Sequence, residues 1–214
     1  MSGIMYIPAA FQLSDCAVLH KFVRTHSFAV IAGLIGGDIH LAYAPVLFIE
    51  DSHHGRVQFH LARANPMAAL KEGQSVKISF MGPHSYISPN WYQSSQVPTW
   101  NYLAAEGVGQ VRRLNTEELE RQLAALAAQH EAYAAPDNPW SPEKLNLEQR
   151  TALLKAISGF EVEFVSLEGK LKLSQNKSQA DIEGAIAGLE KRDDSASRDV
   201  ASAMREFSLH HKAT

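Results

Sequence analysis

The sequence predicts a mainly β fold with flanking helices, in which antiparallel strands form a meander or a barrel. Short segments that are apolar or alternate between apolar and polar residues recur in the first half of the chain, at 28–34, 39–50, 57–62 and 76–80. Such segments are typical of strands that bury at least one face. Tight turns separate most of them, and Gly36–Asp38 is typical of a hairpin turn. Helix-start signals stand mainly outside this run of strands, which favours an antiparallel sheet over a parallel one.

A strand that leads into a helix is predicted at 57–70. Apolar residues alternate with polar ones over 57–62, so Gln58 and His60 lie on the face opposite the core. Asn65–Pro66 is a strong helix start, with asparagine as the N-cap. Arg63 stands at this junction, where a helix N-terminus and a guanidinium group together favour a phosphate or a carboxylate. The alternative is an ordinary strand–helix corner with a surface arginine.

A long loop rich in aromatic residues and prolines is predicted at 82–102. Such a loop inside a compact domain is usually functional or part of an interface. Trp100 and Asn101 place an aromatic ring beside an amide, which suits a flat heteroaromatic ligand. The alternative for these aromatic residues is an apolar plug between two subunits.

The second half of the chain is predicted to begin with helices and to return to the sheet. Asn115 and Glu118 form a capping box for a helix to about residue 133, and Asn146 caps a helix to about 157. Alternation predicts a last hairpin, with strands near 160–164 and 171–174 and a turn at Glu168–Gly169. We expect one domain over residues 1–190 with a helical insertion around 115–158. Residues 191–214 are expected to form a polar loop and a further helix from about Arg198.

A second basic segment follows the predicted turn. On a strand, Lys170, Lys172 and Ser174 share one face and could meet a phosphate. The alternative is a solvated basic edge of the sheet, which protects sheets against aggregation.

Composition excludes several functional classes. The chain has 214 residues, 45% of them hydrophobic and 20% charged, and a net charge of -3, which argues against broad nucleic-acid binding. Its single cysteine, Cys16, precludes an intramolecular disulfide and suits a reducing compartment. Histidine and cysteine spacings predict no metal site, and no P-loop, G-x-S-x-G or G-x-G-x-x-G motif occurs. No apolar run approaches the roughly 18 residues of a membrane span. We therefore expect a cytoplasmic protein.

Several segments together resemble one protein family. They are M-Y-I-P at 5–8, H-L-A-R-A-N-P at 60–66, G-P-H-S-Y-I-S-P-N-W-Y at 82–92, V-P-T-W-N-Y at 97–102, G-F-E-V-E at 159–163 and E-G-K-L-K-L-S-Q-N-K at 168–177. In this order they are similar to the PaiB-like proteins, described as FMN-binding negative transcriptional regulators, within the FMN-binding split-barrel superfamily.

The resemblance implies a six-stranded split β-barrel and a homodimer that binds FMN. The cofactor-binding residues that it implies are His60, Ala62, Arg63, Asn65, Trp100, Asn101, Lys172, Ser174 and Gln175. One departure stands out, because Ala42–Pro45 replaces the T-H-L-P of relatives, and this puts flavin retention in question.

The resemblance leaves the role of the flavin open. We expect a flavin-dependent oxidoreductase or a flavin-sensing regulator, and we assign no catalytic residue. The alternatives are a regulator without flavin, which could contact DNA, and a haem-binding split-barrel protein.

Overall fold

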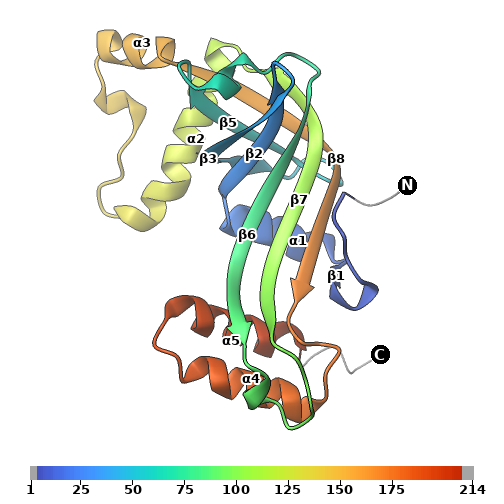
Figure 1. Cartoon of the computed structure of the whole chain (residues 1–214). Helices are drawn as coiled ribbons and strands as arrows, with labels where there is room; N and C mark the ends of the chain where they lie inside the picture. Colours follow the sequence, from blue (N-terminus) through green and yellow to red (C-terminus); the bar gives the residue numbers. More distant parts are fainter. Residues whose placement is uncertain (1–3, 209–214) are drawn as a thin grey trace. The chain divides into compact units, whose positions relative to one another are not determined.

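The computed structural model describes residues 4–208 and contains a mainly antiparallel sheet with five α-helices (Figure 1). The strands are β1 (Gln12–Leu13), β2 (Phe28–Ile35), β3 (Asp38–Pro45), β4 (Leu47–Ile49), β5 (Arg56–Ala62), β6 (Ser75–Ile87), β7 (Thr99–Arg113) and β8 (Ile157–Lys172). The α-helices are α1 (Cys16–Thr25), α2 (Thr116–Ala134), α3 (Leu147–Lys155), α4 (Gln179–Glu190) and α5 (Ser195–Ser208). Short 3-10 helices are η1 (Ala9–Phe11), η2 (Pro66–Ala69), η3 (Pro89–Trp91) and η4 (Pro142–Lys144).

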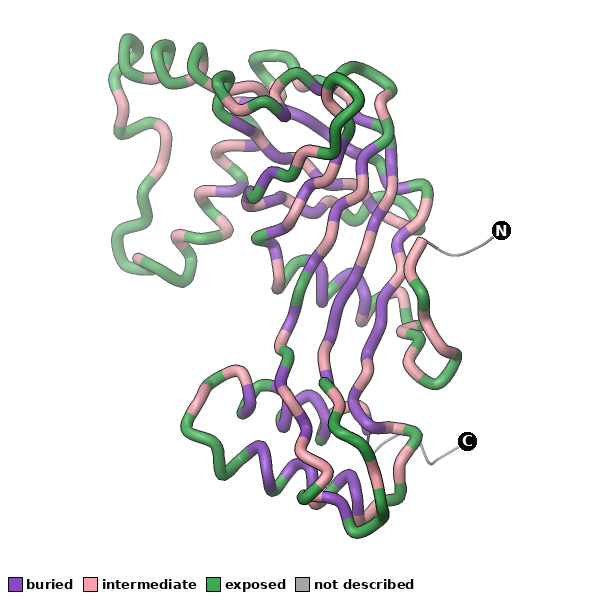
Figure 2. The backbone as a smooth tube through the Cα atoms, viewed as in Figure 1, coloured by how far each residue is buried: buried purple, intermediate pink, exposed green. Residues whose placement is uncertain are grey.

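The chain divides into two compact units, each with its own core. The sheet unit comprises residues 23–80 and 106–167, and the helical unit comprises the described parts of 1–22, 81–105 and 168–214. The strands β6, β7 and β8 contribute residues to both units. Buried residues alternate mainly with intermediate ones along much of these strands, as Figure 2 shows. No α-helix between residues 4 and 208 is both long enough and apolar enough to span a membrane.

The core of the sheet unit is formed by the alternation that the sequence predicts. The strand order is β3-β2-β6-β7-β8-β5-β4, and β5 pairs antiparallel with β8 from Arg56–Glu163 to Ala62–Ile157. Phe59 and Phe160 face each other in this pairing, and both are fully buried with their rings stacked. The helix α2 contacts β4 and β5.

The predicted hairpin between β2 and β3 is confirmed. The two strands pair from Phe28–Pro45 to Ile35–Asp38 across Gly36 and Gly37. Both glycines have positive φ, which a residue with a side chain adopts only at a cost.

In the helical unit, α4 packs on α5 and on the segment around η3. Gly184 and Gly188 of α4 lie directly against Trp91. Asp181, in the first turn of α4, accepts hydrogen bonds from the backbone N–H of Gln93 at 2.8 Å and the hydroxyl of Ser94 at 2.6 Å. The several donors hold the pKa of this carboxyl well below its usual value, at about 2. The predicted helix near the C-terminus is present as α5.

Three sequence predictions about the sheet are wrong. The sheet has eight strands rather than six, and its strands follow an open order within the described chain. The predicted hairpin at 160–174 is instead one continuous strand, β8. Gly169 makes no turn there: its backbone φ is not positive, and the absence of a side chain lets Leu13 and Leu19 approach closely.

The predicted long loop at 82–102 is shorter in the structure, because both of its ends belong to strands. The strand β6 continues to Ile87 and β7 begins at Thr99, so only 88–98 lies between them. Pro83 does not end β6, because the fixed φ of proline suits extended backbone.

A candidate anion-binding site

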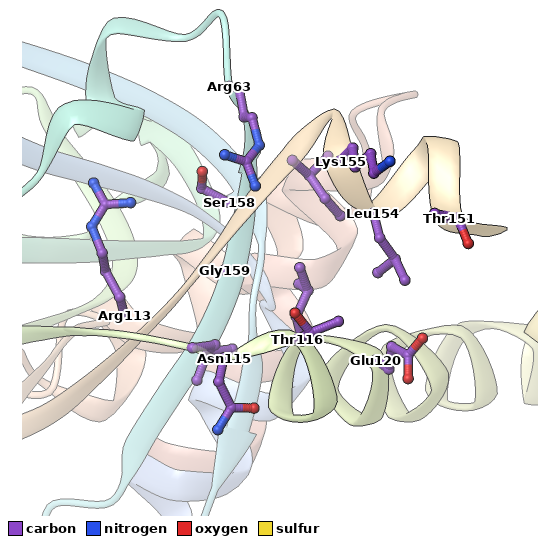
Figure 3. A pocket seen from close by; sticks show the side chains of 13 residues that line it. Arg63, Arg113, Asn115, Thr116, Glu120, Thr151, Leu154, Lys155, Ser158 and Gly159 are labelled. Carbon is purple, nitrogen blue, oxygen red and sulfur yellow. The ribbon is translucent and has the colours of Figure 1, made fainter.

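A cationic pocket of about 370 Å³ opens in the sheet unit where the first turn of α2, the end of α3 and the start of β8 meet (Figure 3). Its lining combines three cationic side chains with hydroxyl and amide groups and a few apolar ones. The lining residues are Arg63, Arg113, Leu114, Asn115, Thr116, Leu119, Glu120, Thr151, Leu154, Lys155, Ile157, Ser158 and Gly159. We call it the cationic pocket.

The N-terminus of α2 forms one side of this pocket. The Asn115 side chain accepts from the Glu118 backbone N–H at 2.9 Å, and Glu118 accepts from the Asn115 N–H at 2.9 Å, which completes the predicted capping box. This box uses neither the N–H of Thr116 nor that of Glu117, which belong to the first helical turn. With the positive end of the helix dipole, these groups favour a bound anion.

Two of the three cations are available to such an anion. The side chains of Arg63 and Lys155 are exposed, and neither forms a hydrogen bond or ion pair with any residue between 4 and 208. Arg63 points toward Ser158 in Figure 3. The one acidic residue in the lining, Glu120, is 3.1 Å from the guanidinium group of Arg150 and is therefore paired.

Arg113 is held in place by the fold. One of its terminal nitrogens donates to the backbone oxygens of Ala68 and Leu70, each at 2.8 Å, and its guanidinium group lies 5.2 Å from the centre of the Phe160 ring. It contributes positive charge to the pocket while it ties the end of η2 to the sheet.

Of the residues predicted from the segment 57–66, only Arg63 lines this pocket. Ala62 is exposed at the end of β5. Asn65 caps η2 and accepts from the backbone N–H of Met67 at 2.9 Å. Gln58, on the predicted face, donates to Glu161 at 2.6 Å.

His60 lies on the face that the alternation predicts and contacts α2. Its Nδ1 is 3.2 Å from the side-chain oxygen of Gln122. Burial lowers the pKa of His60 below 6.5 more than this hydrogen bond raises it, so the imidazole is neutral at pH 7. His60 lines a second, apolar cavity rather than the cationic pocket.

The other predicted residues belong to the helical unit, and most use their polar groups internally. Asn101 is 1% exposed and donates to the Ser174 hydroxyl at 3.0 Å. Ser174 lies past the end of β8 with φ of 65°, so it does not share a strand face with Lys172. Gln175 accepts from the Leu173 N–H at 2.7 Å.

Lys170 and Lys172 are also engaged in the helical unit. The Lys172 ammonium donates to the Thr99 hydroxyl at 2.5 Å, and the Lys170 ammonium donates to the Tyr6 carbonyl oxygen at 3.0 Å. Trp100 is the exception among the predicted residues of the helical unit, because 52% of it is exposed. Its ring lies beside those of His84 and Tyr86, with centroids 6.3 and 6.2 Å away.

Sequence reasoning missed Lys155, Asn115 and Thr116 as pocket residues. The capping box did indicate a helix N-terminus at Asn115. The signal that was missing is the pairing of β5 with β8, which sets Ala62 opposite Ile157 and so brings Arg63 next to the end of α3. The backbone N–H of Arg63 donates to the Ala156 oxygen at 2.9 Å and fixes this approach.

Comparison with known families shows the family of the chain. A family described as "Putative FMN-binding domain" matches residues 5–166, a range that includes every residue of the cationic pocket. The chain belongs to this FMN-binding family. The resemblance to PaiB-like proteins seen in the sequence is confirmed.

A curated relative supports this assignment, and two solved structures share the fold. The "Protease synthase and sporulation protein PAI 2" of Bacillus subtilis is 30% identical over 203 residues, which cover 94% of this chain and 97% of that protein. Among solved structures, the FAD and heme binding protein of Mycobacterium smegmatis has a TM-score of 0.57 at 16% identity, over 75% of this chain and 73% of that one. The flavocytochrome Anf3 of Azotobacter vinelandii has a TM-score of 0.59 at 11% identity, over 79% and 74%. At these identities the two solved structures show a shared fold.

Proposed function

We propose that the chain is a split-barrel flavoprotein that binds FMN and anchors it by its phosphate in the cationic pocket. The observation that carries this proposal is the position of Arg63 and Lys155, two cations without partners in the described chain, beside the open N-terminus of α2. A phosphate monoester with nearly two negative charges is the part of FMN that such a site binds. Membership in the FMN-binding family supports the same ligand.

The donor set of the pocket fits this part of the cofactor. Hydroxyl and amide groups of Ser158, Thr116 and Asn115 can hydrogen-bond phosphate oxygens or the hydroxyls of the ribityl chain. A pocket of 370 Å³ is near the lower end of ligand sites, which span about 300–1,000 Å³. It therefore suits the phosphate and ribityl end of FMN, with the ring outside it.

We assign the residues of the cationic pocket the role of binding and orienting the cofactor. When bound, FMN supplies one- and two-electron redox chemistry. Binding through the phosphate serves a flavin-dependent oxidoreductase and a flavin-sensing regulator equally well. Assays of flavin reduction distinguish these two roles.

A titration of the purified chain with FMN and with riboflavin tests the proposal. We expect FMN to bind at least about tenfold more tightly, since hydrogen bonds to charged groups contribute about 1.5–3 kcal/mol each. Flavin fluorescence and isothermal calorimetry measure both affinities. Equal affinity for the two ligands, or no binding of either, would contradict a phosphate anchor.

We also propose that the chain forms a homodimer through the outer face of β2 and β3. Five large apolar side chains on this face are more than half exposed: Phe28, Leu34, Ile39, Leu41 and Tyr43. They alternate with buried residues of the same strands, so they share one face. An apolar patch of this kind is uncommon on a monomer, and the family resemblance supports a second copy as its occupant.

Leu41→Glu is expected to convert the dimer to a monomer, because it places a carboxylate in the middle of the apolar face. Analytical ultracentrifugation at several concentrations measures the change in mass. Leu147→Glu is the matched control, since Leu147 is 81% exposed and belongs to α3 rather than to β2 or β3. A wild-type chain that sediments as a monomer at all concentrations would refute the dimer.

A further inference from the structure

A second cavity of about 470 Å³ lies in the sheet unit between α2, α3 and the segment that joins them. It is lined by His60, Glu120, Leu123, Leu126, Ala127, His130, Glu131, Trp140, Pro142, Leu145, Arg150, Leu153, Leu154, Ala156 and Ile157. Most of these side chains are apolar, and we call this space the apolar cavity. It shares Glu120, Leu154 and Ile157 with the cationic pocket, so the two adjoin.

The charged groups of the apolar cavity are already engaged. Glu120 is paired with Arg150 at 3.1 Å. A carboxylate oxygen of Glu131 accepts from the backbone N–H of Trp140 at 2.7 Å, which fastens the joining segment to α2. An ionic ligand would therefore have to displace existing contacts, and the cavity favours a neutral one.

The polar groups of His60 and Gln122 do not make all the hydrogen bonds of which they are capable. The side-chain oxygen of Gln122 can only accept, so the proton of the neutral His60 ring is on Nδ1 and the other ring nitrogen is an acceptor. Gln122 is 1% exposed, and its side-chain nitrogen has no hydrogen-bond partner. A buried polar atom without a partner costs free energy. This pair thus offers unsatisfied hydrogen-bonding capacity beside an apolar space that His60 lines.

We propose that the apolar cavity binds a neutral aromatic molecule that carries a hydroxyl or N–H donor. The leucine side chains and the indole ring of Trp140 bury the aromatic rings, and the free ring nitrogen of His60 accepts the donor. The volume of about 470 Å³ lies within the range of about 300–1,000 Å³ typical of small-molecule sites, so a molecule of two fused rings can enter it. This site is distinct from the phosphate anchor and does not rest on the proposed function, although a ligand there would lie next to the cationic pocket.

Binding of 2-naphthol tests this proposal, with 2-methoxynaphthalene as the probe that lacks the donor. Isothermal calorimetry on the full chain measures both affinities. We expect 2-naphthol to bind at least about tenfold more tightly than the methoxy compound, since the latter leaves the His60 acceptor unsatisfied. Equal binding of the two compounds, or no binding of 2-naphthol, would overturn the proposal.

Substitutions that fill the apolar cavity test whether 2-naphthol binds there. Ala127→Phe projects a ring into the apolar cavity and should weaken 2-naphthol binding at least about tenfold. Ala128→Phe is the matched control, because Ala128 is the next residue of α2, is exposed and does not line the cavity. Leu153→Trp fills the same space from α3 at a side chain that is 56% exposed, and it should give the same loss without depending on tolerance at Ala127.

The affinity of the filled variants for FMN distinguishes the apolar cavity from the cofactor site. Ala127→Phe and Leu153→Trp should retain wild-type affinity for FMN while they lose 2-naphthol. Unchanged 2-naphthol binding in both variants would exclude this cavity. Parallel loss of FMN and 2-naphthol would show that the cavity belongs to the flavin and would likewise refute a separate site.

Discussion

Replacing both Arg63 and Lys155 by alanine is expected to weaken FMN binding by about 2–4 kcal/mol, or roughly 30- to 1,000-fold, and to leave riboflavin binding unchanged. Each side chain is expected to contribute a charge-assisted contact to the phosphate, and riboflavin has no phosphate to lose. The estimate is below the sum of two fully buried contacts, because both side chains are exposed and salt screens them. Fluorescence titrations of the two ligands measure the effect.

A control variant with the same loss of charge separates local contacts from the overall field of the protein. Arg121→Ala combined with Lys144→Ala removes two positive charges from the sheet unit, and neither residue lines the cationic pocket. This control should bind FMN as the wild type does. The effect of the Arg63 and Lys155 pair should also shrink as ionic strength rises. If the control lost as much affinity as the pocket variant, the phosphate would not be anchored here.

Features that depend on neighbouring residues were predictable from the sequence. The alternation over 57–62 correctly separated the buried residues of β5 from Gln58 and His60 on the opposite face. The caps at Asn65, Asn115 and Asn146 were also correct, since a cap joins a side chain to the backbone two or three residues later. Such interactions need no information about the rest of the chain.

Features that depend on distant residues were not predictable. Gly169 is of a residue type common in turns. In the structure it lies inside β8, in close contact with Leu13 and Leu19. Lys155 reaches the pocket of Arg63 only because β5 pairs with β8. Asn101 and Ser174 have the chemistry of ligand-binding residues, but in the structure they hydrogen-bond to each other in the interior of the helical unit. A sequence shows which groups are present, whereas the fold decides which of them remain available.

The close packing of α4 on Trp91 in the helical unit can be tested by adding a methyl group to α4. Gly188→Ala is expected to lower the free energy of unfolding by about 3 kcal/mol, although alanine in a helix interior normally adds about 1 kcal/mol relative to glycine. The added Cβ would lie 2.2 Å from Cδ2 of the Trp91 indole, so the ring would have to move. The unfolding midpoint should fall by about 5–10 °C, which thermal denaturation followed by circular dichroism measures. A higher midpoint would show that the indole does not pack on this face of α4.

A second substitution identifies the group with which the new methyl collides. Trp91→Leu removes the indole, so in that background Gly188→Ala should become neutral or stabilising by about 1 kcal/mol, as expected from helix propensity. Gly184→Ala should not be rescued, because its Cβ would lie 2.1 Å from the backbone oxygen of Trp91, which the leucine variant retains. The two glycines of α4 thus meet different atoms of one residue, and only the collision with the side chain can be relieved by changing that side chain. If both alanine variants were rescued equally, the Trp91 backbone would not be held against α4 as the structure places it.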